Sequence, residues 1–217
     1  MKAVIWDFDG TLYDTYPGMI RALMATLADF GLPGKPDELL VQTKRDSMKR
    51  VFDDYAKAMN PANSTTPRAQ LQATYNAHEP VLNADPRLFP DAKVAIQTVT
   101  ANGGVNLLWT HRDERAWRLL KRDHLDNEFI GGTTIDMHFK RKPDPESLLY
   151  LIDKYQLNPA TTLVVGDRKL DSEAAKAAKC LSLYLDVDEL HDAPHADYTA
   201  QNMTDALPIV REFMAVN

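Results

Sequence analysis

The stretch that decides the fold is residues 3–11, which read Ala-Val-Ile-Trp-Asp-Phe-Asp-Gly-Thr. Its four leading apolar residues form a continuous run, which is typical of a parallel strand buried on both faces. Two aspartates follow at once. Because side chains alternate along a strand, Asp7 and Asp9 should project toward the same side. The pattern predicts a buried strand that ends in a pair of carboxylates, and the bland alternative is a solvated acidic turn.

Strand-like and helix-like segments alternate from residue 85 to the end of the chain. Apolar runs predict strands at 105–109, 128–135, 161–165, 181–185 and 197–199. Helical periodicity predicts helices at 91–101, 115–122, 145–155, 170–179 and 203–214. This alternation predicts an α/β fold with a Rossmann-like parallel sheet and helices on both faces. Ligands of such sheets bind beyond the carboxyl ends of the strands.

The segment between these two parts carries helical signals only. Four helices are predicted, over 16–30, from Pro36, over about 46–59, and from an N-cap at Thr66 to about residue 78. A stretch rich in Pro, Asn and Asp, residues 80–86, predicts a linker. We therefore expect residues 1–14 and 85–217 to form the core domain, and residues 15–84 to form a small all-helical cap domain.

Composition narrows the class of protein. The 217 residues include a single cysteine, which excludes an intramolecular disulfide framework. The net charge of −6 argues against nucleic-acid binding, and no apolar run approaches the ~20 residues of a membrane span. The first residues lack a signal-peptide layout. We expect a cytoplasmic monomer that binds neither nucleic acid nor membrane.

A second acidic strand end occurs at 164–171, where Gly166 and Asp167 are followed by Asp171. Carboxylates with backbone carbonyls and water make an all-oxygen site that suits Mg²⁺. The alternative is that Asp171 simply caps the next helix. Two further polar residues occupy similar places: Thr110 follows a predicted strand, and Lys142 precedes a helix beside two prolines. Each could bind a phosphate, or be an ordinary turn residue.

Taken in order, these elements resemble the motifs of the haloacid dehalogenase superfamily. The pattern there is Asp-x-Asp-Gly-Thr after an apolar strand, a Thr or Ser after a second strand, a Lys, and then Gly-Asp with a further Asp. The resemblance covers nearly the whole chain and includes a helical cap inserted after the first motif, as in the subfamily of phosphoglycolate phosphatase and β-phosphoglucomutase. It implies a Mg²⁺-dependent phosphatase acting on a small phosphorylated metabolite.

The resemblance also implies roles for single residues. Asp7 would be the nucleophile that becomes an aspartyl phosphate, and Asp9 the general acid and base. Thr110 and Lys142 would bind the phosphoryl oxygens. The expected metal ligands are Asp7, Asp9 through its carbonyl, Asp167 and Asp171. The expected substrate contacts are Gly10, Thr11, His111, Arg112, Lys44 and Arg45. Related phosphatases often carry Asn where this chain has His111, which could instead cap a helix. Lys44 and Arg45 could equally belong to a solvated helix face.

Several other functions compete with the phosphatase. A phosphosugar mutase would use the same aspartyl phosphate but return the phosphoryl group to the substrate. A dehalogenase needs neither the second aspartate nor a metal, so Asp9, Asp167 and Asp171 count against it. A phosphonate hydrolase would require a Schiff-base lysine in the cap, for which Lys44 is available. A non-catalytic binding or regulatory protein of the same fold is the remaining alternative.

Overall fold

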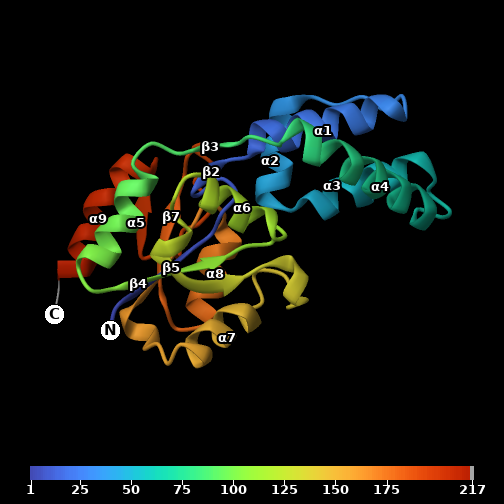
Figure 1. Ribbon diagram of the computed structural model, residues 1–217. Helices are drawn as coiled ribbons and strands as arrows, with labels where there is room; N and C mark the ends of the chain where they lie inside the picture. The colour runs from blue at the N-terminus through green and yellow to red at the C-terminus, as the bar shows by residue number, and fades with distance from the viewer. Residues whose placement is uncertain (216–217) are drawn as a thin grey trace. The chain divides into compact units, whose positions relative to one another are not determined.

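The computed structural model describes residues 1–215 (Figure 1). The chain divides into two compact units, one made of Met1–Tyr13 with Leu88–Asn217 and the other of Asp14–Arg87. The chain crosses between them at two short strands, β2 (Tyr13–Asp14) and β3 (Arg87–Leu88), which pair with each other. Neither strand was predicted, because two residues carry no periodicity.

The first unit contains a six-stranded sheet in the order β5-β4-β1-β6-β7-β8, and all five pairs of neighbouring strands are parallel. Its strands are β1 (Ala3–Trp6), β4 (Val105–Trp109), β5 (Phe129–Thr133), β6 (Thr162–Gly166), β7 (Leu181–Leu185) and β8 (Tyr198–Ala200). The decisive strand β1 lies between β4 and β6. Its central place explains why all four of its residues are apolar and buried.

Helices cover both faces of this sheet (Figure 1). One face packs against α5 (Ala92–Ala101), α6 (Arg115–Arg122) and α9 (Met203–Ala215), and the other against α7 (Glu146–Lys154) and α8 (Lys169–Ala177). The strand β1 contributes Val4 and Trp6 to the first core, and Ala3 and Ile5 to the second. Short 3₁₀ turns occur at Asp126–Glu128, Ile135–Met137 and Pro159–Thr161. The predicted α/β fold is confirmed.

The second unit is all helical. It contains α1 (Tyr16–Asp29), α2 (Pro36–Arg45), α3 (Met48–Met59) and α4 (Thr65–Leu82) around its own apolar core. The N-cap residue of helix α3 is Ser47, whose Oγ accepts a hydrogen bond from the backbone N–H of Arg50 at 3.1 Å. This is the local chemistry expected of an N-cap serine.

The end of α4 differs from the sequence-based prediction. The helix was expected to stop near residue 78 before a linker at 80–86, but it continues through Pro80 to Leu82. Its last turn is held by a buried hydrogen bond of 2.9 Å from Asn83 Nδ2 to Glu79 Oε1. Gly18 of α1 lets Asn83 come so close that a Cβ there would lie 2.3 Å from Asn83 Oδ1. Packing of Asn83 against Gly18 thus overrides the helix-stop signal that Pro80 gives in the sequence.

The start of α4 also differs from the prediction. The expected N-cap at Thr66 was wrong, since the N-cap residue is Ser64.

Within residues 1–215, no helix is both long enough and apolar enough to cross a membrane.

Candidate active site

The carboxyl end of β1 presents the first two acidic residues. The backbone N–H of Asp7 still bonds to the carbonyl of Val165 at 2.8 Å, so Asp7 is fixed by the sheet and its side chain is buried. The chain then turns sharply at Gly10, whose φ is 76°, in the left-handed region that glycine adopts without strain. Asp9 lies on this turn and is partly exposed. The two carboxylates therefore differ in surroundings, although they are two residues apart.

The carboxyl end of β6 supplies two more carboxylates. Asp167 follows the strand directly, and Asp171 lies in the first turn of α8. Asp171 Oδ2 accepts the N–H of Arg168 at 3.0 Å, so the capping role anticipated for this residue is present. A Cβ on Gly166 would come within 2.4 Å of the Asp171 side chain. Glycine at that position leaves the room that the carboxylate occupies.

These strand ends bring three buried carboxylates together. Asp7, Asp167 and Asp171 each offer an oxygen, and these oxygens lie within 4.8 Å of one another. Lys142 joins them, with its Nζ 2.7 Å from Asp7 Oδ1 and 2.8 Å from Asp171 Oδ1. When ionised, the three buried carboxylates and Lys142 together carry a net negative charge, and an all-oxygen donor set is what Mg²⁺ prefers. The residues present fit a divalent cation.

The pKa values of Asp7 and Lys142 also indicate a site suited to a cation. Burial raises the pKa of Asp7 to about 8, Lys142 opposes the rise, and Asp171 and Asp167 add to it. Burial alone would lower the pKa of Lys142, but the carboxylates of Asp171 and Asp7 raise it, and the net pKa lies above the ordinary value. Lys142 is therefore charged at neutral pH. Asp7 needs further positive charge nearby to stay ionised at neutral pH.

The loop after β4 carries three sequence-predicted residues, and each makes a different contact. Thr110 is buried, and its Oγ1 accepts the N–H of Arg112 at 2.9 Å. His111 Nε2 accepts the backbone N–H of Lys142 at 3.3 Å. Burial, together with Lys142, Arg141 and Arg168, lowers the pKa of His111 to about 2, so the ring stays neutral. Arg112 reaches Asp9, with Nε and Nη2 at 2.9 and 2.8 Å from Oδ1.

Trp109 is part of the site although the sequence reasoning did not select it. Its ring centroid lies 3.6 Å from Lys142 Nζ, and its carbonyl accepts from the same ammonium at 3.3 Å. The indole nitrogen donates to Ser147 Oγ at 2.7 Å, which fixes the ring. The available signal was its position as the last residue of β4, next to Thr110. A cation against an aromatic face is a favourable contact that also orients the lysine.

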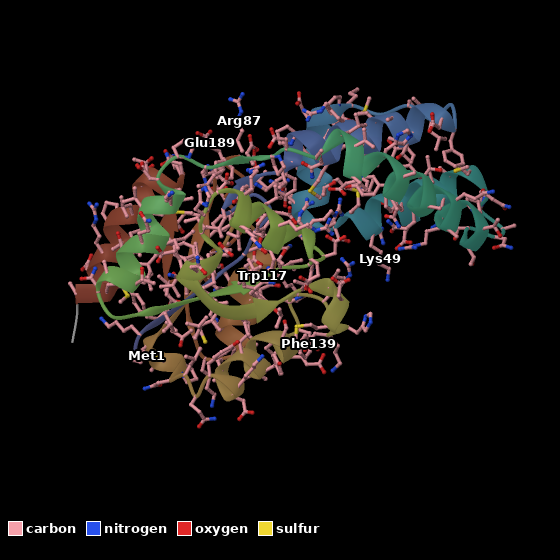
Figure 2. All side chains as sticks on the ribbon, viewed as in Figure 1. Met1, Lys49, Arg87, Trp117, Phe139 and Glu189 are labelled. Carbon is pink, nitrogen blue, oxygen red and sulfur yellow. The ribbon has the colours of Figure 1, made fainter. Side chains whose placement is uncertain are left out.

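The remaining predicted residues are placed as follows. Thr11 is fully buried in the turn after Asp9. Lys44 and Arg45 end α2 in the helical unit. Lys44 is buried, with Nζ 4.7 Å from the centroid of the Tyr16 ring, whereas Arg45 is exposed. Lys49 and Arg50, at the start of α3, are exposed, and Figure 2 shows Lys49 projecting from the helical unit.

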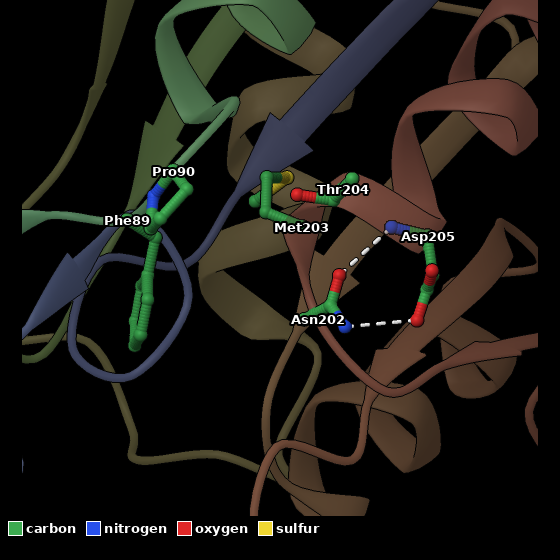
Figure 3. A pocket seen from close by; sticks show the side chains of 6 residues that line it. All are labelled: Phe89, Pro90, Asn202, Met203, Thr204 and Asp205. Carbon is green, nitrogen blue, oxygen red and sulfur yellow. Dashed lines mark hydrogen bonds between the residues drawn. The ribbon is translucent and has the colours of Figure 1, made fainter.

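A pocket of about 330 Å³ lies at the start of α9 and includes none of the predicted site residues. Figure 3 shows its lining, with Phe89 and Pro90 on one side and the residues at the start of α9 on the other. Asn202 and Asp205 are tied to each other by two hydrogen bonds of 2.9 Å, which close the first turn of the helix. Thr204 Oγ1 donates to Asp91 Oδ2 at 2.6 Å. These polar side chains are hydrogen-bonded within the fold, so we assign no chemistry to this pocket.

Comparison with known proteins supports the motif-based interpretation. Residues 4–184 match the family model of haloacid dehalogenase-like hydrolases. A phosphoglycolate phosphatase from Mannheimia succiniciproducens is 29% identical over 223 residues, covering 96% of this chain and 98% of the relative. One from Aliivibrio fischeri is 31% identical over 213 residues, covering 91% and 89%. The prediction of an enzyme of this superfamily is confirmed.

A solved structure shows the same fold. The crystal structure of a predicted phosphoglycolate phosphatase from Haemophilus somnus superposes with a TM-score of 0.78 at 22% identity, covering 96% of this chain and 97% of that one. Fold, motif order and family match agree. The chain therefore belongs to the haloacid dehalogenase-like hydrolases.

Proposed function

We propose that this chain is a Mg²⁺-dependent phosphatase that hydrolyses a small phosphorylated metabolite through an aspartyl phosphate on Asp7. The observation that carries the proposal is the buried cluster in which Lys142 joins Asp7 and Asp171 beside Asp167. Buried carboxylates with one shared ammonium are costly for a fold and are typical of a reaction centre. The family membership supports the same chemistry.

The first half-reaction transfers the phosphoryl group to Asp7. A carboxylate oxygen of Asp7 attacks phosphorus, the ester P–O bond breaks, and its electron pair stays on the leaving oxygen. Asp9 gives that oxygen a proton, so an alcohol departs. Lys142 and Thr110 are the proposed contacts for the phosphoryl oxygens, with the backbone at Gly10 and Thr11 beside them. Lys142 offers an ammonium held by Trp109, which places positive charge where negative charge develops.

The second half-reaction regenerates the enzyme. Asp9, now a carboxylate, takes a proton from a water molecule whose oxygen attacks phosphorus. The bond between phosphorus and the Asp7 oxygen breaks, and inorganic phosphate leaves. One carboxyl thus serves as acid and then as base, which requires it to stay at the same place in both steps.

The residues that would hold Mg²⁺ are Asp7, Asp167, Asp171 and the carbonyl of Asp9. When bound, Mg²⁺ would supply positive charge that screens the Asp7 carboxylate from an anionic substrate. Magnesium is therefore a proposed cofactor, supported by the spacing of the three carboxylates and by their burial.

The relatives support a substrate class. Two of them are named phosphoglycolate phosphatases and match along nine tenths of this chain or more. We take a small phosphorylated carboxylate, such as phosphoglycolate, as the first substrate to test. Arg141 and Arg168 act electrostatically on His111, so the region carries positive charge beyond Lys142. Lys44, Arg45 and His111 remain proposed substrate contacts.

The test is phosphate release from phosphoglycolate and from an aryl phosphate, with Mg²⁺ and with EDTA. Wild type should turn over only with the metal, and Asp7→Asn should lose at least about a thousandfold, because the nucleophile is gone. Asp37→Asn, an exposed carboxylate of the helical unit, is the matched control and should keep full activity. Unchanged turnover in Asp7→Asn would refute the proposal. Activity that requires a bisphosphate primer would indicate a mutase.

A further inference from the structure

Arg112 and Asp9 form a close, two-point contact that the motifs do not explain. Both Nε and Nη2 of the guanidinium contact one carboxylate oxygen, Oδ1, at 2.9 and 2.8 Å. The arginine side chain is only 4% exposed, whereas the aspartate side chain is 21% exposed. The contact joins residues that lie 103 positions apart in the sequence. The buried partner is thus the arginine, and the accessible partner is the proposed acid and base.

The backbone of Arg112 is fixed on both sides. Its N–H donates to Thr110 Oγ1 at 2.9 Å, and its carbonyl accepts the N–H of Ile135 at 3.1 Å. The guanidinium carbon lies 5.8 Å from the centroid of the Phe8 ring, a residue next to Asp9 in the chain. An arginine whose backbone is held by two hydrogen bonds, and whose planar guanidinium lies near an aromatic ring, has few alternative rotamers. Arg112 can therefore serve as a fixed point for whatever it contacts.

Asp9, in contrast, lies where the sheet no longer holds the chain. The parallel ladder of β1 extends to the N–H of Asp7, and the glycine turn begins at Gly10. A short acidic side chain on a turn has several rotamers available, and fixing one of them requires a partner. The two nitrogens of Arg112 supply that partner.

We propose that Arg112 is a positioning residue that holds the Asp9 carboxyl in the orientation needed for proton transfer to the leaving oxygen. The inference rests on the proposed function, in which Asp9 is the acid and base. Neither of the two contacts uses Oδ2, the carboxylate oxygen through which a proton can be exchanged. This role differs from the substrate contact expected for Arg112 from the sequence.

Two substrates separate positioning from binding. An alkyl phosphate has a poor leaving group that needs a proton, whereas 2,4-dinitrophenyl phosphate has a leaving group that departs without one. Both carry the same phosphoryl group. The ratio kcat/KM reports all steps up to departure of the leaving group, so it isolates the half-reaction in which Asp9 acts as acid. The comparison is made for Arg112→Met, Arg112→Lys and Asp9→Asn with Mg²⁺ present.

In Arg112→Met we expect kcat/KM to fall about a hundredfold on the alkyl phosphate and less than about threefold on the dinitrophenyl ester. Asp9→Asn should show the same pattern, more strongly. Arg112→Lys keeps the charge but loses the fork, so it should recover only part of the alkyl phosphate rate. Arg115→Met is the matched control, because Arg115 pairs with Asp113 in the same loop, and it should leave both rates unchanged.

Equal losses on the two substrates would overturn the positioning role, because a residue that binds the phosphoryl group, or one that only supports the fold, affects both alike. The ratio between the substrates is independent of the folded fraction, so partial unfolding of a variant does not obscure the result. Absence of Mg²⁺-dependent turnover in wild type would instead refute the proposed function, and this inference with it.

Discussion

The ammonium of Lys142 lies 2.7 Å from the carboxylate of Asp7, and both side chains are more than nine-tenths buried. The same ammonium is 2.8 Å from Asp171, so one cation joins the ends of β1 and β6. Such a shared buried cation stabilises two carboxylates that would otherwise repel each other.

Replacement of Lys142 by Met should therefore have two effects. Phosphatase activity should fall about 10²–10³-fold, because a charge beside the phosphoryl group is lost. The free energy of unfolding without metal should fall by about 3 kcal/mol, because the carboxylates lose their counter-charge. Thermal denaturation in EDTA and phosphate release measure the two effects. Lys140→Met is the control, since Lys140 is largely exposed. Equal phosphate release and equal thermal stability in the two variants would contradict the role of Lys142.

Magnesium should stabilise the folded protein through the three carboxylates. At a Mg²⁺ concentration of about 100 Kd the gain is about 2.7 kcal/mol, which corresponds to a rise in Tm of roughly 5–10 °C for a chain of this length. Asp167→Asn should abolish most of the rise, because it removes one charged oxygen donor from the cluster. Scanning calorimetry with Mg²⁺ and with EDTA provides the measurement. A rise of equal size in Asp167→Asn would place the metal elsewhere.

Gly166→Ala tests the close packing that shapes the metal site. The new Cβ would lie 2.4 Å from the side chain of Asp171, so the carboxylate must move. We expect Mg²⁺ affinity to fall about 10–100-fold. Gly18→Ala is the matched control, because its Cβ would strike Asn83 in the helical unit. Both variants should lose stability, but only Gly166→Ala should show a smaller Mg²⁺-dependent rise in Tm than wild type, at about half of it or less. A rise of the wild-type size in Gly166→Ala would contradict this role of Gly166.

The sequence revealed those parts of the site that local pattern determines. A buried strand ending at Asp7, and another ending before Asp167, were sufficient to predict which sheet edge carries the chemistry. Thr110 and Lys142 were candidates from their positions at strand and helix ends, and the family resemblance supplied their expected role. The directions of side chains were not predictable, because a contact such as that of Arg112 with Asp9, 103 positions away, leaves no local signal in the sequence. The extension of α4 past Pro80 was missed for a similar reason, since it depends on the contact between Gly18 and Asn83.

The hydrogen bond between Tyr13 and Asp123 should make part of the protein's stability depend on pH in the acid range. Tyr13 donates a hydrogen bond of 2.7 Å to Asp123 Oδ2, and Arg122 contacts the same carboxylate. The hydrogen bond from Arg122 is the main cause of a lowered pKa for Asp123, opposed by partial burial and reinforced by Tyr13. A carboxyl whose pKa is lowered by folding stabilises the protein above its unfolded pKa of about 3.9, and that contribution disappears as the pH falls through the folded pKa.

Asp123→Asn should accordingly cost about 0.5–1 kcal/mol at pH 6, because the carboxylate is partly exposed and screened by solvent. The difference from wild type should shrink steadily below pH 4, where the wild-type carboxyl begins to take up a proton. Denaturant unfolding at pH 6, 5, 4 and 3 measures this difference. Asp126→Asn, in the turn that follows, is the control and should change little at any pH. A cost for Asp123→Asn that is constant from pH 6 to 3 would show that shape, and not charge, is what Asp123 contributes.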